Sequence, residues 1–429
     1  MKLGILTNVV CNLSLDEALA YFKGMGMEMV EIGCGGTPGT HHCDPEILLH
    51  DDEKMEAFRK SIQASGLQIS AFSCHGNPVH PIPEIAQRYD RIMRNGVLMA
   101  ERMGVDTICC FSGCPGSEEN AKYPHWTTTV WPFDAVAANR YQWEKVLIPY
   151  WKEFCAFARE HHVNKIAIEM HPGFCVYNPE TLLRLREACG PEIGANFDPS
   201  HLIWQGIDIP TAIRKLSGCI YHFHAKDTYV DEVEMGKNGF FSPMGAFGDK
   251  YTPFAFRIPG NGTSVSYWRK IMTALAQTGY DGAISIEHED NTIGQDEGIR
   301  KSVAFLKQII VREQASECWW KESIRDYQRT FLPAKEGIII PTFSSSFLII
   351  LQTLNPSIPG NITSNIIIAG FSFKANFTPN SPLSASITSY PFLFKFIFKN
   401  PLILSSSSII SIFFITSPQT SKLIIILYL

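Results

Sequence analysis

Short apolar runs alternate with stretches of helical periodicity over residues 1–311. This alternation predicts a parallel sheet covered by helices. The apolar runs are bounded by turn residues and have strand length, and we predict strands over 2–8, 29–34, 68–75, 106–112, 165–171, 193–198, 220–226 and 282–289.

The segments between these runs repeat apolar residues at helical spacing, and glycine follows most of them, as is typical of a helix end. Eight β-then-α units fit an α/β fold of the (β/α)8 TIM barrel type. A doubly wound sheet is disfavoured, because the phosphate-binding GxGxxG pattern is absent after the first strand. The predicted helices are 15–25, 83–103, 143–162, 179–189, 209–216, 266–279 and 297–311.

Two connections, 113–141 and 228–265, are longer than a barrel needs, and we predict that they are loops. Both follow a strand, so they belong to the end of the barrel where barrel enzymes keep their chemistry.

Side chains alternate between the two faces of a strand, so the apolar residues of the last four strands show which of their neighbours point into the barrel. In each of these strands, one residue of a metal-ligating type points inward at the C-terminal end. The four residues are Glu169, Asp198, His224 and Glu287.

Three carboxylates in a narrow barrel mouth would repel one another unless a cation lay among them. Any one of the four residues could instead cap a strand or a helix, but coincidence at matching positions on four consecutive strands is the weaker hypothesis. We therefore expect one divalent metal ion. Oxygen-rich ligation with one imidazole suits manganese, our first choice, and also magnesium, cobalt or zinc.

The motifs EMHP, FDPSH, HFHAKD and SIEHED, together with RIPGNG, resemble the xylose isomerase-like TIM barrel family of sugar phosphate isomerases and epimerases. The resemblance covers residues 1–311 and is strongest from Lys165 onward. It implies that Glu169, Asp198, His224 and Glu287 ligate the metal. It also implies that the two glutamates act as acid and base, as in epimerases of the D-tagatose 3-epimerase type.

The expected function is a divalent-metal-dependent isomerase or epimerase of a sugar or sugar derivative. Glu169 and Glu287 would transfer the proton through an enediolate that the metal stabilises. A lyase or dehydratase of the same superfamily, acting on 3-keto-glycosides or inososes, begins with the same step and stays open. A non-catalytic sugar-binding barrel and an endonuclease IV-type DNA repair enzyme are weaker alternatives, the latter because no histidine lies between His224 and His288.

Four further residues are candidates for substrate binding. The family resemblance implicates His201, which lies three residues after Asp198, and Arg257 of the RIPGNG loop; a turn cap and a surface arginine are the respective alternatives. His75 has inward parity at the end of the third strand, and His171 lies two residues beyond Glu169. Either could equally be a buried, hydrogen-bonded histidine.

Three more polar residues near the strand ends are expected to be structural. Lys226 and Asp227 are expected to pair with each other, with substrate binding as the alternative. Glu31 is expected to have a structural role at its strand end, with a hydrogen bond to a sugar hydroxyl as the alternative.

The distribution of charged side chains limits the kinds of molecule that the chain is expected to bind. Residues 1–337 hold all 42 acidic side chains and 33 of the 37 basic ones, which disfavours a grip on nucleic acid. We expect a small carbohydrate substrate, no nucleic acid and no membrane for the barrel, and the sequence is compatible with a homo-oligomer. The twelve cysteines form no CxxC pair and the first residues have no leader pattern, which favours the cytoplasm.

The last part of the chain differs in composition. Residues 337–429 are rich in Ile, Ser, Phe and Leu and contain four lysines but no acid, arginine or histidine. We predict a barrel over 1–312, an extension of it over 313–336, and a tail over 337–429 that is not an ordinary domain. Ser, Pro and Asn interrupt its apolar runs, which disfavours a membrane span. A translation or gene-model artefact, or else a disordered tail, is the expected explanation.

Overall fold

The structure is a computed structural model of the whole chain. It describes residues 1–241, 252–313 and 320 and, for their backbone, five strand segments of the C-terminal region. The chain divides into two compact units, Met1–Ala315 and Ser316–Leu429.

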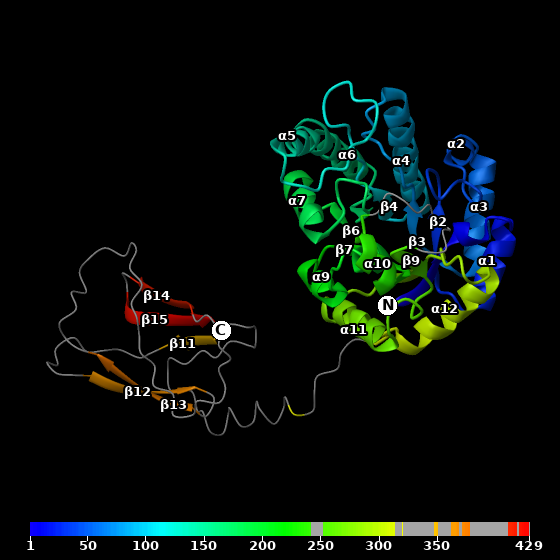
Figure 1. Cartoon of the computed structure of the whole chain (residues 1–429). Coiled ribbons are helices and arrows are strands. Elements are labelled where there is room, and N and C mark those ends of the chain that lie inside the picture. Colours follow the sequence, from blue (N-terminus) through cyan, green and yellow to red (C-terminus); the bar gives the residue numbers. More distant parts are fainter. Residues whose placement is uncertain are drawn as a thin grey trace. The chain divides into compact units, whose positions relative to one another are not determined.

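The first unit contains a closed barrel of eight parallel strands, each predicted from the sequence (Figure 1). Neighbouring strands pair in chain order, and the last strand closes the barrel by pairing with the first. The predicted TIM barrel is therefore confirmed, although every strand ends before its predicted limit. The strands are β1 (Lys2–Leu6), β2 (Met29–Gly33), β3 (Gln68–Ser73), β4 (Thr107–Phe111), β5 (Lys165–Glu169), β6 (Ile193–Phe197), β7 (Ile220–Ala225) and β10 (Ala283–Ile286).

Helices follow the strands and surround the barrel (Figure 1). Several begin at a side chain that accepts a backbone N–H, such as Ser14, which forms a capping box with Glu17. Helix α3 over 52–65 is absent from the predicted set, although apolar residues there recur at helical spacing. The helical segments are η1 (Thr7–Val10), α1 (Leu15–Gly24), α2 (Pro45–Leu48), α3 (Asp52–Ser65), α4 (Pro83–Met103), α5 (Phe133–Tyr141), η2 (Gln142–Leu147), α6 (Ile148–Glu160), α7 (Pro179–Cys189), α8 (Pro199–Ile203), α9 (Ile209–Lys215), α10 (Glu232–Asn238), α11 (Val265–Gln277) and α12 (Gln295–Ile309).

The two long connections are not simply loops, so that prediction was wrong in part. Helix α5 occupies the end of the connection after β4. The connection after β7 contains α10 and an antiparallel hairpin of β8 (Asp227–Val230) and β9 (Phe254–Arg257). Residues 242–251 of this connection lie outside the described part of the chain.

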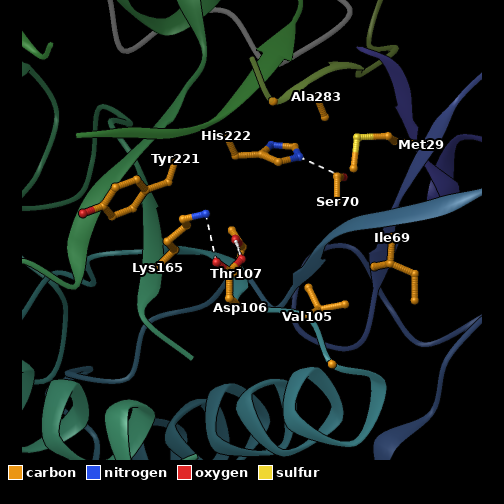
Figure 2. A pocket seen from close by; sticks show the side chains of 12 residues that line it. Met29, Ile69, Ser70, Val105, Asp106, Thr107, Lys165, Tyr221, His222 and Ala283 are labelled. Atoms are coloured by element: carbon orange, nitrogen blue, oxygen red, sulfur yellow. Dashed lines mark hydrogen bonds and ion pairs between the residues drawn. The ribbon is translucent and has the colours of Figure 1, made fainter. Parts of the chain in front are cut away.

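A cavity of about 410 Å³ lies at the amino ends of the barrel strands. Its lining includes the first residues of several strands, among them Met29, Thr107 and Ala283 (Figure 2). The buried His222 forms part of the wall, and its Nε2 lies 3.0 Å from Ser70 Oγ. This cavity is at the opposite end of the strands from the predicted metal ligands.

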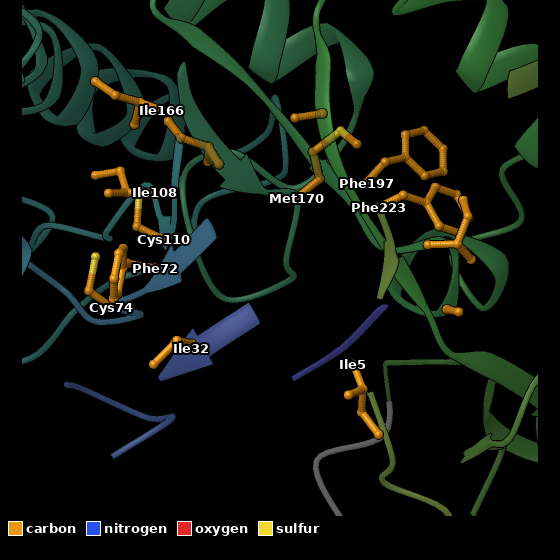
Figure 3. Close-up of a cluster of buried hydrophobic side chains, with 14 of the residues drawn as sticks. Ile5, Ile32, Phe72, Cys74, Ile108, Cys110, Ile166, Met170, Phe197 and Phe223 are labelled. Atoms are coloured by element: carbon orange, nitrogen blue, oxygen red, sulfur yellow. The ribbon is translucent and has the colours of Figure 1, made fainter. Parts of the chain in front are cut away.

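The apolar core lies between the strands and the helices. Ile166, Phe197 and Phe223, which parity predicts to point away from the barrel axis, belong to one large buried cluster (Figure 3). A separate small cluster contains residues of the opposite parity, Ala71, Cys109 and Ala167. The parity rule is therefore confirmed for these strands, and the inward positions are left to small and polar side chains.

The second unit contains antiparallel strands. One sheet has the order β11-β15-β14 and a second pairs β12 with β13. The other residues after 313, Trp320 apart, lie outside the described part of the chain, so the extension over 313–336 and the interpretation of the tail stay predictions. No described helix has the length and apolar character of a transmembrane span. The strands are β11 (Phe347–Ile350), β12 (Ile362–Ile368), β13 (Phe371–Phe377), β14 (Ser411–Ser417) and β15 (Thr420–Tyr428).

Candidate active site

Four consecutive barrel strands bring the predicted ligands to one mouth of the barrel. Glu169 is the last residue of β5, and Asp198 follows β6 directly. His224 lies near the end of β7, and Glu287 follows β10 directly. Because the parallel strands end at the same edge of the barrel, these four side chains lie close together although they are far apart in the sequence.

Three of the four residues form a group that could hold a metal ion. Ligand atoms of Glu169, His224 and Glu287 all lie within 4.8 Å of one another. His224 Nδ1 is 3.0 Å from a Glu287 oxygen and 3.4 Å from a Glu169 oxygen. The imidazole thus presents one nitrogen to both carboxylates, as a shared cation site requires.

Asp198 lies beside this group and is not one of its three members. Its Oδ1 caps helix α8 by accepting the N–H of Ser200 at 2.8 Å. Its Oδ2 is buried and lies 3.0 Å from Lys226 Nζ and 3.3 Å from His201 Nε2. Burial raises the pKa of Asp198 to about 6 despite the nearby ammonium. A buried carboxylate oxygen next to two glutamates and an imidazole suits a divalent ion.

Lys226 supplies a positive charge within the cluster. Its Nζ is 2.7 Å from Glu287, 3.0 Å from Asp198 and 3.0 Å from Glu289, and the residue is 2% exposed. Burial alone would lower the pKa of Lys226, but the surrounding carboxylates raise it well above its ordinary value. Burial alone would likewise raise the pKa of Glu287, whereas Lys226 and His224 lower it to about 2.

The predicted pairing of Lys226 with Asp227 is wrong, because the chain turns from β7 into β8 between them. The Asp227 carboxylate faces the RIPGNG loop instead. Its Oδ2 accepts the backbone N–H of Gly260, Gly262 and Thr263 at 2.9–3.1 Å. Asp227 therefore fixes the loop that leads into α11.

Glu169 is surrounded by histidine and amide side chains. His75 Nε2 and the Asn196 amide each lie 3.1 Å from Oε2, and His201 Nε2 lies 3.2 Å from Oε1. Burial alone would raise the pKa of Glu169, but His201, His224 and His75 hold it well below its ordinary value. Asn196 was not a predicted site residue, although the alternation of side chains along its strand places it on the inward face.

Of the other two predicted substrate residues, His171 adjoins the cluster, because ligand atoms of Glu169, His171 and His201 all lie within 4.8 Å of one another. The His171 ring centre is 4.0 Å from that of His201, and its Nδ1–H donates to the Pro172 carbonyl at 2.6 Å. Burial lowers the pKa of His171 to about 3, so this imidazole is neutral. Arg257 lies 3.6 Å from Asp290 and donates to the Phe256 carbonyl oxygen at 2.7 Å. Its contact with substrate stays a prediction.

A second polar layer lies next to His224 on the inward face. Glu31 contacts His224 Nε2, and Ser285 Oγ donates to Glu31 at 2.7 Å. Ligand atoms of Glu31, His222 and His224 also lie within 4.8 Å of one another. The contact between Glu31 and His224 was not predicted. The alternation of side chains along a strand shows which face a residue lies on, but it does not show which residue of another strand it contacts.

The chain is similar in sequence to a known protein family and to individual proteins. Residues 19–309 match the protein family described as "Xylose isomerase-like TIM barrel". The uncharacterized protein YfiH of Bacillus subtilis (strain 168) is 34% identical over 312 residues, which are 72% of this chain and 99% of that protein. An inosose dehydratase of Bacillus cereus (strain AH820) is 29% identical over 140 residues, which are 30% of this chain and 45% of that enzyme.

Among solved structures, 3-keto-D-glucoside 4-epimerase YcjR from E. coli is similar at a TM-score of 0.50 and 15% sequence identity. The similarity covers 72% of this chain and 99% of that chain. At such low identity, the likeness concerns the barrel fold alone.

Proposed function

The chain belongs to the xylose isomerase-like TIM barrel family, and from this membership we propose that it is a divalent-metal-dependent isomerase or epimerase of a sugar or sugar derivative. The ions that suit the donor set are manganese first, then magnesium, cobalt or zinc. Glu169, Asp198, His224 and Glu287 would hold the ion.

The observation that carries this proposal is the pair of carboxylates beside one imidazole nitrogen. Glu169 and Glu287 come from β5 and from the residue after β10, and both lie within 3.4 Å of His224 Nδ1. The pKa of each carboxyl is lowered, so both are ionised at neutral pH. An ionised carboxylate can act as the base that removes a proton, and the other carboxyl can return a proton once it has taken one from solvent.

A bound divalent ion would polarise a substrate carbonyl and stabilise negative charge on it. One glutamate then removes the proton from the carbon beside the carbonyl. Delivery of a proton by the other glutamate to the opposite face gives an epimer, and return of a proton to the neighbouring carbon gives an isomer. His75 and His201 hold Glu169 in place, and burial excludes competing water.

A dehydratase is the second candidate, because a partial relative is an inosose dehydratase. Dehydration shares the first proton removal and then expels a hydroxyl group. Product analysis separates the two reactions, because an isomer or epimer keeps the mass of the substrate and a dehydrated product loses one water.

The test is a screen of ketoses, inososes and 3-keto-glycosides with the purified chain, with and without Mn²⁺. Turnover in D₂O should place deuterium on the carbon beside the carbonyl, measured by mass spectrometry. Absence of both metal binding and metal-dependent turnover would refute the proposal.

Glu287→Gln should abolish deuterium exchange, because the amide cannot accept the proton. Glu289→Gln is the matched control, since Glu289 also contacts Lys226 but its side chain is 47% exposed and it is not in the three-residue group. The control should keep exchange. Retained exchange in Glu287→Gln would remove this residue from the acid–base role.

A further inference from the structure

Glu31 is a fully buried carboxylate beneath the proposed metal site. It lies on β2, and both of its oxygens are 3.0 Å from His224 Nε2. Ser285 Oγ donates to Oε2 at 2.7 Å, and Ser73 Oγ donates to Oε1. Burial of an ionised carboxylate is costly unless hydrogen bonds compensate it, and these three donors do so.

The contact fixes which nitrogen of His224 keeps its proton when a cation binds. An ionised carboxylate only accepts hydrogen bonds, so the nitrogen that faces Glu31 must be protonated. That nitrogen is Nε2. Nδ1 lies on the other side of the ring, 3.0 Å from Glu287 and 3.4 Å from Glu169. These carboxylates also accept hydrogen bonds, so Nδ1 carries a proton as well until a cation takes its place. The nitrogen available for a cation therefore points at the two glutamates.

We propose that Glu31 is a positioning residue that holds His224 as the Nε2–H form and directs Nδ1 at the metal ion. The inference rests on the proposed function, since it concerns the same ion. Carboxylates that hold a ligating histidine in this way typically contribute 10–100-fold to metal affinity. Glu31 thus acts through His224 and does not touch the ion.

A second cation between Glu31, His222 and His224 is the competing explanation of the same cluster. Their ligand atoms lie within 4.8 Å of one another. However, His222 Nε2 is 3.8 Å from Glu31 and 3.0 Å from Ser70 Oγ, so it already has a partner. Hydrogen bonds satisfy Glu31 as well, and the positioning role explains its contacts without a second ion.

The test is calorimetric titration of the full-length chain with Mn²⁺. Glu31→Gln should weaken binding about 10–100-fold and leave the stoichiometry at one ion. Ser285→Ala is the matched control, because it removes another hydrogen bond to Glu31 but keeps the contact with His224; it should change affinity less than about threefold. Binding by Glu31→Gln within threefold of the wild type would overturn the proposal. So would two ions in the wild type and one in the variant.

A second measurement needs neither a variant at Glu31 nor a metal. Histidine ¹⁵N NMR of the metal-free wild type, with His224→Gln to assign the signals, should show a proton on Nε2 of His224. An unprotonated Nε2 would overturn the inference even where Mn²⁺ binds, which separates its failure from that of the proposed function. Failure of Mn²⁺ to bind the wild type would remove the proposed function and the positioning role together.

Discussion

Replacement of Asp227 should strongly destabilise the barrel. Asp227 is fully buried, and its Oδ2 accepts N–H groups of Gly260, Gly262 and Thr263 and the indole N–H of Trp268. Its Oδ1 accepts the N–H of Thr228 at 2.9 Å. Asp227→Ala leaves all of these donors without an acceptor.

The expected loss of stability in Asp227→Ala follows from the number of N–H groups that donate to Oδ2. Each N–H that loses its acceptor costs about 1 kcal/mol at the low end of the usual range, so the four together cost roughly 4 kcal/mol. Asp227→Asn should cost less, roughly 1–2 kcal/mol, because an amide oxygen can take the place of Oδ2 while the Thr263 hydroxyl reorients. The expected order of stability is wild type, then Asp227→Asn, then Asp227→Ala.

Urea denaturation of the full-length chain, followed by circular dichroism, measures these differences as shifts in midpoint at constant slope. Asp208→Ala is the control. Asp208 is an exposed N-cap that accepts one N–H, from Thr211 at 3.0 Å, and its loss should cost about 1 kcal/mol. A loss of stability in Asp227→Ala no greater than that in Asp208→Ala would refute the reasoning.

Three further outcomes are expected. Gly36→Ala should destabilise the protein by more than about 2 kcal/mol in the same assay, because φ is +68° and the new Cβ would lie 1.8 Å from the His75 carbonyl oxygen. Gly24→Ala, with nothing within 4 Å, should not destabilise it. Burial lowers the pKa of His42, so the folded state binds fewer protons than the unfolded state and stability falls as pH drops below about 6.5. His42→Gln should make that decline shallower between pH 7 and 5; an unchanged slope would contradict this. Mn²⁺ at a hundredfold excess over its Kd should add about 2.7 kcal/mol of stability, measured by thermal unfolding with and without EDTA. His224→Ala should remove this increment, and an increment that survives would assign the effect to another site.

Local pattern sufficed to predict the barrel and the inward direction of its ligands. Parity is a property of each strand, so the apolar neighbours of Glu169 and Glu287 reveal their direction without knowledge of the rest of the fold. The strand ends were less well predicted, because β10 stops at Ile286 and leaves Glu287 just beyond the ladder. The end of a strand depends on its hydrogen bonds with neighbouring strands, and the sequence of a single strand does not show where those bonds stop.

Partners across the barrel could not be predicted in the same way. Lys226 and Asp227 are adjacent in the sequence, yet one faces Asp198 and Glu287 and the other faces the loop before α11. The turn into β8 separates them, and the β8–β9 hairpin forms between segments that are more than twenty residues apart. The contact of Glu31 with His224 joins β2 to β7 and has no local signal at all.

The division of each strand into an inward and an outward face affects how a barrel of this kind can evolve. The side chains that pack against the helices hold the fold together, while the side chains that meet at the barrel mouth carry the chemistry. A change in one set therefore need not alter the packing of the other. A descendant could therefore acquire a new substrate by exchange of inward and loop residues while it inherits its folding from residues that alternate with them along the same strands.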